Sequence, residues 1–178
     1  MIKKSQIPNY LTGARAVAVP VSLAVMLLHN DPLILFGIFV FAAITDFFDG
    51  YLARKWNCVS TFGALVDPVA DKLLVALMLL YLLQHNETPL TPVALILLRE
   101  IYISSLREFL SARGAALPVS KGGKCKTAVQ MISIATLLFA LAEDTDSVWN
   151  FGLILLWIAA GLAITSAVQY TKNAAQHF

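Results

Sequence analysis

The chain contains 178 residues, of which 58% are hydrophobic and 13% are charged, and its formal net charge is +2. Soluble domains carry about a quarter charged residues, so this composition excludes a disordered chain, a nucleic-acid-binding domain and most soluble enzymes. Two cysteines are too few for a disulfide framework.

Six apolar segments follow one another along the chain, each close to the roughly 20 residues that span a bilayer core. They are Tyr10–Leu28, Pro32–Phe48, Val66–Leu83, Pro92–Leu110, Ala128–Ala142 and Val148–Tyr170. Backbone in lipid must satisfy its own hydrogen bonds, which leaves helices or a closed barrel. Runs such as Leu73–Leu83 are continuously apolar, which rejects a barrel. The sequence therefore predicts an all-α membrane protein, a six-transmembrane-helix bundle that forms one integral-membrane domain over residues 1–178.

Outside the apolar segments, basic residues occur only at the two ends of the chain and in every second connection between the segments. They include Lys3, Lys4, Arg54, Lys55, Arg113, Lys121, Lys124 and Lys172. The other connections hold acids and no Lys or Arg, namely Asp31, Glu87, Glu143, Asp144 and Asp146. By the positive-inside rule, both termini and the two long loops are predicted to face the cytoplasm.

Four carboxylates at membrane helix ends are unexpected, because ionisable groups there are costly and are functional candidates. They lie on two helical stripes with small residues beside them. The stripes are Asp46, Asp49, Gly50 and Ala53 in the second segment, and Gly63, Asp67 and Asp71 at the third. Spacings of three and four residues put each set on one helix face. A short connection makes the two helices antiparallel neighbours, so the four carboxylates are expected to meet.

Four neighbouring carboxylates cannot all stay ionised without compensation, so protonation or metal binding is expected. Oxygen ligands without His or Cys suit hard cations such as Mg²⁺ or Mn²⁺, and carboxylate-bound Mg²⁺ usually also meets substrate phosphates. One alternative is a set of helix-end charges that pair with Arg54, Lys55 and Lys72. A second is a divalent-cation transporter, although transporters often contain repeats and this sequence shows none.

The arrangement Asp46-x2-Asp49-Gly50-x2-Ala53-Arg54-x8-Gly63-x3-Asp67-x3-Asp71 resembles the signature of the CDP-alcohol phosphatidyltransferases. Further stretches resemble one branch of that family: residues 7–15, 67–72, 99–101, 106–108 and 120–127, and Gln130. The resemblance implies a six-helix membrane enzyme that transfers a phosphatidyl group from CDP-diacylglycerol to glycerol 3-phosphate and releases CMP. A sister enzyme that uses another acceptor alcohol is the alternative within the family.

The resemblance also implies roles for single residues. Asp46, Asp49, Asp67 and Asp71 would hold two Mg²⁺ or Mn²⁺ ions on the CDP diphosphate, and Asp71 would be the general base for the acceptor hydroxyl. The CDP-binding side would comprise Gly50, Ala53, Arg54 and Gly63, with Asn9 and Thr12, for which helix capping is an alternative. The enzyme would lie in the bacterial inner membrane, often as a homodimer, with its active site at the cytoplasmic face.

A phosphate-bearing acceptor calls for a basic pocket. The candidates for acceptor-phosphate binding are Arg107, Arg113, Lys124 and Lys126, with Lys121 beside them. Topology and anionic headgroups are the alternative explanation for such residues. Arg15 and Arg99 lie within apolar segments and are expected to face the bundle or a wet cavity. Each is a candidate for contact with substrate, and the alternative for Arg99 is a pairing with an acidic residue that holds a helix in register.

Overall fold

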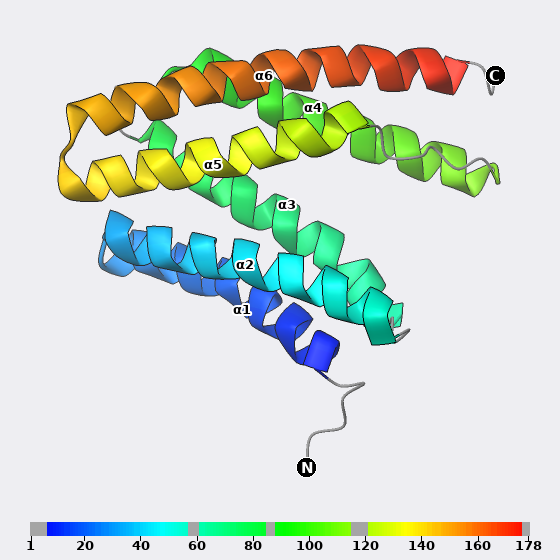
Figure 1. Cartoon of the computed structure of the whole chain (residues 1–178), viewed down its shortest axis with the longest axis horizontal. Helices are drawn as coiled ribbons and strands as arrows, with labels where there is room; N and C mark the ends of the chain where they lie inside the picture. Colours follow the sequence, from blue (N-terminus) through cyan, green and yellow to red (C-terminus); the bar gives the residue numbers. More distant parts are fainter. Residues whose placement is uncertain (1–6, 57–60, 85–87, 115–120, 176–178) are drawn as a thin grey trace. The chain divides into compact units, whose positions relative to one another are not determined.

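Helices make up all the regular structure in the described part of the computed structural model, which comprises residues 7–56, 61–84, 88–114 and 121–175 (Figure 1). The helices are α1 (Ile7–Leu28), α2 (Pro32–Trp56), α3 (Thr61–Leu83), α4 (Leu90–Ala112), α5 (Lys121–Glu143) and α6 (Asp146–Ala175). Each predicted apolar segment lies inside one of these helices, so the all-helical prediction is confirmed for the described residues.

The second helix extends well beyond its predicted apolar segment. The segment was expected to end at Phe48, but α2 continues to Trp56. The polar continuation contains good helix formers such as Leu52, Ala53 and Arg54. The backbone of the acidic and glycine motif is therefore helical, as the stripe argument requires.

Two tight turns join helices at acid-bearing connections. Asn30 (φ 49°) lies between α1 and α2, and Asp144 (φ 48°) lies between α5 and α6. Asn and Asp enter this left-handed region more readily than other side chains that carry a Cβ, so each chain reversal needs few residues. Asp31 then caps α2, because its Oδ1 accepts hydrogen bonds from the backbone N–H groups of Leu33 (2.9 Å) and Ile34 (3.3 Å).

The helices form two compact units, residues 1–81 with 141–144 and residues 82–140 with 145–178, and each is described by itself. In the first unit α1 packs along α2. Its buried apolar residues include Leu35 and Phe39 of α2, and Leu74 and Met78 of α3. Apolar burial of this kind positions the polar ends of the three helices.

In the second unit α4 packs along α6, and α5 and α6 run antiparallel (Figure 1). Ser133 Oγ of α5 donates a hydrogen bond of 2.9 Å to the carbonyl oxygen of Gly152 in α6. A Cβ placed on Gly152 would lie 2.8 Å from two side-chain atoms of Leu137. The close approach of α5 and α6 at this point therefore depends on a glycine.

Two of the described helices are long and apolar enough to cross a membrane, Cys125–Glu143 within α5 and Asp146–Ala175, which is α6. Shorter apolar stretches cover Gly13–Leu28 and Pro32–Asp46. Large apolar side chains are exposed on several helices, including Phe41, Ile101 and Ile154. The prediction that all six helices span a membrane, with both termini in the cytoplasm, stays a prediction.

Candidate functional site

The guanidinium of Arg15 joins three helices of the first unit through an acidic cluster, which consists of Asp46, Asp67 and Asp71. Arg15 Nη1 lies 3.1 Å from Asp46 Oδ1 and donates a hydrogen bond of 3.2 Å to Asp67 Oδ1. Arg15 Nε lies 3.3 Å from Asp71 Oδ1. One side chain of α1 thus brings together three of the four carboxylates that the sequence singles out on α2 and α3.

Burial differs sharply between the cation and its partners. The Arg15 side chain is 0% exposed, whereas those of Asp46, Asp67 and Asp71 are 55%, 29% and 43% exposed. A buried charge is tolerated only when it is paired, and here three carboxylates share one arginine. The carboxylates of the cluster are therefore accessible from outside the unit, whereas the Arg15 side chain is not.

The acidic cluster has the ligand chemistry of a hard divalent cation, since carboxylate oxygens from α2 and α3 are its only donors. Its geometry differs from that of a formed metal site. Among the described residues, no three or more His, Cys, Asp or Glu side chains are arranged to enclose an ion. The three residues fit Mg²⁺ or Mn²⁺ by the type of their ligand atoms, and Arg15 contacts all three of them.

Several predicted site residues have helical backbone, but their side chains lie outside the described residues. On α2 these are Asp49, Gly50, Ala53 and Arg54, and on the other helices they are Asn9, Thr12, Gly63 and Lys124. Asp49 follows Asp46 by three positions on α2, so both belong to one helix face. The predicted roles of these residues in metal, nucleotide and phosphate binding stay predictions.

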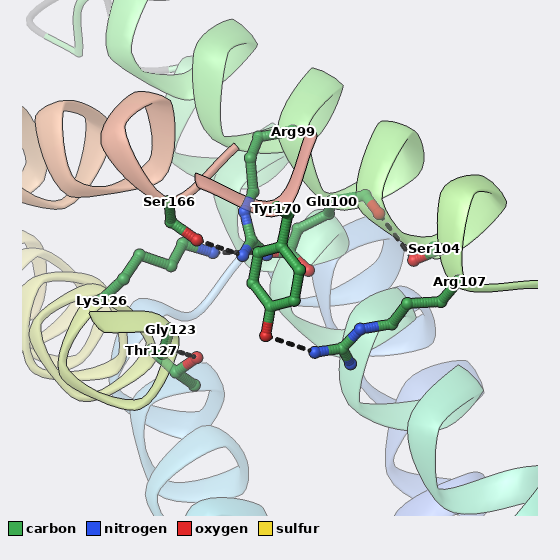
Figure 2. A network of polar contacts seen from close by, with 9 residues as sticks. All are labelled: Arg99, Glu100, Ser104, Arg107, Gly123, Lys126, Thr127, Ser166 and Tyr170. Atoms are coloured by element: carbon green, nitrogen blue, oxygen red, sulfur yellow. Dashed lines mark hydrogen bonds and ion pairs between the residues drawn. The ribbon is translucent and has the colours of Figure 1, made fainter. Parts of the chain in front are cut away.

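The second unit contains a basic network formed by Arg99, Glu100, Arg107, Lys126, Ser166 and Tyr170 (Figure 2). Glu100 Oε1 accepts hydrogen bonds from Arg99 Nη1 (3.0 Å) and from Lys126 Nζ. Arg99 Nη2 donates a hydrogen bond of 2.7 Å to Ser166 Oγ. The network thus joins α4 to α5 through Glu100 and Lys126, and α4 to α6 through Arg99 and Ser166.

Tyr170 of α6 lies between the two arginines of α4 (Figure 2). Its hydroxyl oxygen accepts a hydrogen bond of 2.7 Å from Arg107 Nη2. Its ring centroid lies 5.0 Å from Arg107 Cζ and 5.9 Å from Arg99 Cζ, within the range of cation–π attraction. An aromatic ring and a hydroxyl therefore hold both guanidinium groups in place without neutralising their charge.

Charge in the basic network does not balance, because the cations Arg99, Arg107 and Lys126 accompany one carboxylate, Glu100. Lys126 is 1% exposed. A buried ammonium is costly unless it is paired, which explains its contact with Glu100. The positive charge left over in this partly buried network suits an anion such as a phosphate group.

The three acceptor-phosphate candidates whose side chains the structure describes have different surroundings. Lys126 and Arg107 belong to the basic network. Arg113 is exposed just after the last residue of α4, with its Cζ 4.1 Å from the Phe109 ring centroid. Gly114 follows it with φ 75°, a conformation that ends the helix at this point.

Sequence reasoning left Arg15 without a partner and Glu100 without a role. Arg15 is the one charged residue of the first apolar segment. Because a charge within a membrane helix needs a counterion, its isolation could have indicated an ion pair with an acidic residue of another helix. The predicted pairing of Arg99 with an acid is confirmed, and the acid is its neighbour Glu100. Contact with another helix is made to Ser166, which no spacing rule pointed to.

Comparison with known proteins gives a family match and a set of named relatives. Residues 5–165 match the family model described as CDP-alcohol phosphatidyltransferase. A protein of Rickettsia bellii is 41% identical over 176 residues, covering 97% of this chain and 97% of its own. Proteins of Cereibacter sphaeroides (37% identity, covering 94% and 95%) and Sodalis glossinidius (41%, covering 96% and 95%) are also similar. All three are named CDP-diacylglycerol–glycerol-3-phosphate 3-phosphatidyltransferase.

Proposed function

The chain belongs to the CDP-alcohol phosphatidyltransferase family, and from this we propose that it transfers the phosphatidyl group of CDP-diacylglycerol to glycerol 3-phosphate. The products are phosphatidylglycerophosphate and CMP. The observation that carries this proposal is the similarity, over nearly the full length of the chain, to three proteins named CDP-diacylglycerol–glycerol-3-phosphate 3-phosphatidyltransferase. The chain is therefore a transferase of phospholipid biosynthesis.

In the proposed reaction an acceptor hydroxyl oxygen attacks the phosphorus that carries the diacylglycerol, and the bond from that phosphorus to CMP breaks. The hydroxyl proton passes to a carboxylate, for which we propose Asp71 as general base. Its side chain is 43% exposed, so an acceptor molecule has access to it. Asp71 lies one helical turn after Asp67 on α3, which keeps the base next to a second carboxylate.

We propose that Asp46, Asp49, Asp67 and Asp71 hold two divalent ions, Mg²⁺ or Mn²⁺. When bound, such ions neutralise charge on the diphosphate and on the departing CMP. The nucleotide side is assigned to Gly50, Ala53, Arg54 and Gly63, with Asn9 and Thr12. Small residues at positions 50, 53 and 63 leave room for a ligand to approach the helix backbone.

The acceptor phosphate is assigned to Arg107 and Lys126 of the basic network, together with Arg113 and Lys124. The excess positive charge of that network supports this assignment. Arg107 is the sharpest candidate, because Tyr170 orients its guanidinium without supplying a counter-charge. Lys126 reaches the phosphate only by exchanging part of its contact with Glu100.

The lipid substrate requires that the enzyme lie in a membrane. We propose one integral-membrane domain of six spans in the bacterial inner membrane, with both termini and the active site on the cytoplasmic side, acting as a homodimer. Outside the apolar segments, basic residues occur only at the two ends and in alternate connections, and this supports the orientation. The two long apolar helices and the exposed apolar side chains support membrane insertion.

The test is a product assay on the purified chain with CDP-diacylglycerol, Mg²⁺ or Mn²⁺, and one acceptor alcohol at a time. CMP release is expected with glycerol 3-phosphate, and chelation of the metal should abolish it. The variant Asp71→Asn should lose about 100-fold or more of the activity, because it removes the proton acceptor.

Three results would change these assignments. Release of CMP with serine or an inositol phosphate, and none with glycerol 3-phosphate, would transfer the chain to a sister activity. Metal uptake into sealed vesicles without lipid turnover would replace the enzyme by a cation transporter. Turnover by Asp71→Asn near that of the parent chain would remove Asp71 as the base.

A further inference from the structure

Three polar side-chain atoms on α4 and α5 are buried without a protein partner. They are Arg99 Nε and Arg107 Nε of α4 and Gln130 Oε1 of α5, and none of them makes a hydrogen bond with the described residues. Burial of such an atom is costly, so each one calls for an explanation. Two of these atoms are donors and the third is an acceptor, so a ligand that satisfies all three offers both kinds of group.

Gln130 lies next to the basic network along α5. It follows Lys126 by one helical turn, so both residues belong to the same face of the helix. Both are almost completely buried, with 3% and 1% of their surface exposed. Long side chains on a helix lean towards its N-terminus, so the Gln130 carboxamide is expected to lie over the turn that carries Lys126. Because Lys126 contacts Glu100 of α4, the carboxamide then lies beside the cations assigned to the acceptor phosphate.

The chemistry of a carboxamide suits a hydroxyl group. Phosphate oxygens accept hydrogen bonds, so an acceptor phosphate satisfies the arginine donors and leaves Gln130 Oε1 without a donor. A hydroxyl group on the same molecule supplies that donor. Glycerol 3-phosphate carries one hydroxyl at C1, which attacks in the proposed reaction, and a second at C2, for which the proposed function names no contact.

We propose that Gln130 is a specificity-determining residue, whose Oε1 accepts a hydrogen bond from the acceptor hydroxyl at C2. Arg107 and Lys126 then recognise the phosphate, and Gln130 recognises the neighbouring hydroxyl. An analogue without this hydroxyl is rejected, because Gln130 Oε1 stays buried and unpaired beside it. The inference rests on the proposed function, since it takes the basic network as the site of the acceptor phosphate.

The experiment measures CMP release by the full-length protein, purified in detergent, with CDP-diacylglycerol, Mg²⁺ and one of two acceptors. Glycerol 3-phosphate is compared with 3-hydroxypropyl phosphate, which keeps the phosphate and the attacking hydroxyl and lacks the hydroxyl at C2. The parent chain should prefer glycerol 3-phosphate by about tenfold or more in kcat/KM. In Gln130→Met, kcat/KM for glycerol 3-phosphate should fall by about tenfold, and kcat/KM for the analogue should stay near that of the parent.

Melting temperature separates this role from a structural one. Gln130→Met removes a buried oxygen that has no protein partner, so it should melt at the parent temperature or above it. Ser133→Ala is the matched control, because Ser133 is also buried on this face of α5 and its hydroxyl already donates to the carbonyl oxygen of Gly152 (2.9 Å). This variant should keep the preference of the parent between the two acceptors.

Equal kcat/KM values for the two acceptors in the parent chain would overturn the inference before any variant is made. A preference that Gln130→Met retains in full would overturn it too, since another group would then recognise the hydroxyl. If Gln130→Met does not fold, or melts lower and loses activity equally with both acceptors, Gln130 has a structural role and the inference fails. In all these cases CMP release by the parent chain with glycerol 3-phosphate leaves the proposed function standing, whereas no release with either acceptor removes both.

Discussion

At the residue scale, two arginines near the same end of α4 illustrate how surroundings distinguish similar side chains. Arg107 is half-buried and bonded to the hydroxyl of Tyr170, whereas Arg113 is exposed beside Phe109. A guanidinium held in a fixed orientation loses less conformational entropy when it binds a phosphate. The two residues are therefore expected to contribute unequally to acceptor binding.

Substituting Arg107→Gln should raise the KM for glycerol 3-phosphate by about tenfold or more, the size expected for loss of a charged hydrogen bond. The KM for CDP-diacylglycerol should stay near that of the parent. Steady-state kinetics with each substrate varied in turn measures both values. Arg113→Gln is the matched comparison, with a smaller rise expected, and equal rises for the two variants would contradict this ranking.

Residue types and spacing on the sequence were sufficient to single out the acids of α2 and α3 as neighbours, since helical periodicity and a short connection require it. They were insufficient for Arg15, whose three partners lie 31, 52 and 56 positions further along the chain. The contact between Arg99 and Ser166 could not be predicted from the sequence for the same reason, because the two residues are 67 positions apart. Contacts of this kind depend on how helices pack.

At the element scale, apolar length predicted the helices correctly and their ends incompletely. The α2 helix continues for several residues beyond its apolar segment. A helix continues as long as its backbone hydrogen bonds do, whereas the thickness of the membrane determines only the length of the apolar part. The same helix therefore serves two purposes, apolar burial at one end and display of the acidic motif at the other.

The contact between α5 and α6 gives a direct test of helix packing. Gly152→Ala adds a Cβ that would lie 2.8 Å from Leu137 atoms, so it should lower the stability by about 1 to 3 kcal/mol through overpacking. Thermal unfolding in detergent measures the change. Gly161→Ala, on the same helix with no atom within 4 Å of the added Cβ, should be neutral or slightly stabilising. A similar loss in both variants would show that glycine flexibility, and not the Leu137 contact, is responsible.

At the scale of the whole molecule, the placement of charge along the chain predicts the orientation in the membrane. Basic residues at alternate connections predict that the start of α6 faces away from the cytoplasm and its end faces into it. The 30 residues of α6 are sufficient to cross a bilayer core, which needs about 20.

Single-cysteine labelling measures this orientation. In a chain with Cys58→Ser and Cys125→Ser, Ser147→Cys should react with a membrane-impermeant maleimide in intact cells. Asn173→Cys should react only after the membrane is opened. Both positions are exposed on α6, so accessibility within the protein is comparable. The reverse pattern would invert the proposed orientation and place the active site outside the cytoplasm.

The sequence alone determined the helical class, the six apolar segments, the family and the acidic stripe, because each of these depends on local composition or on spacing within a few turns. The tertiary structure alone decided that Arg15 contacts three of these acids. It also decided that Glu100 and Tyr170 organise the cations of α4 and α5. Such pairings are decided by packing, since a buried charge takes whichever partner the neighbouring helices bring within reach, and no local pattern encodes that choice.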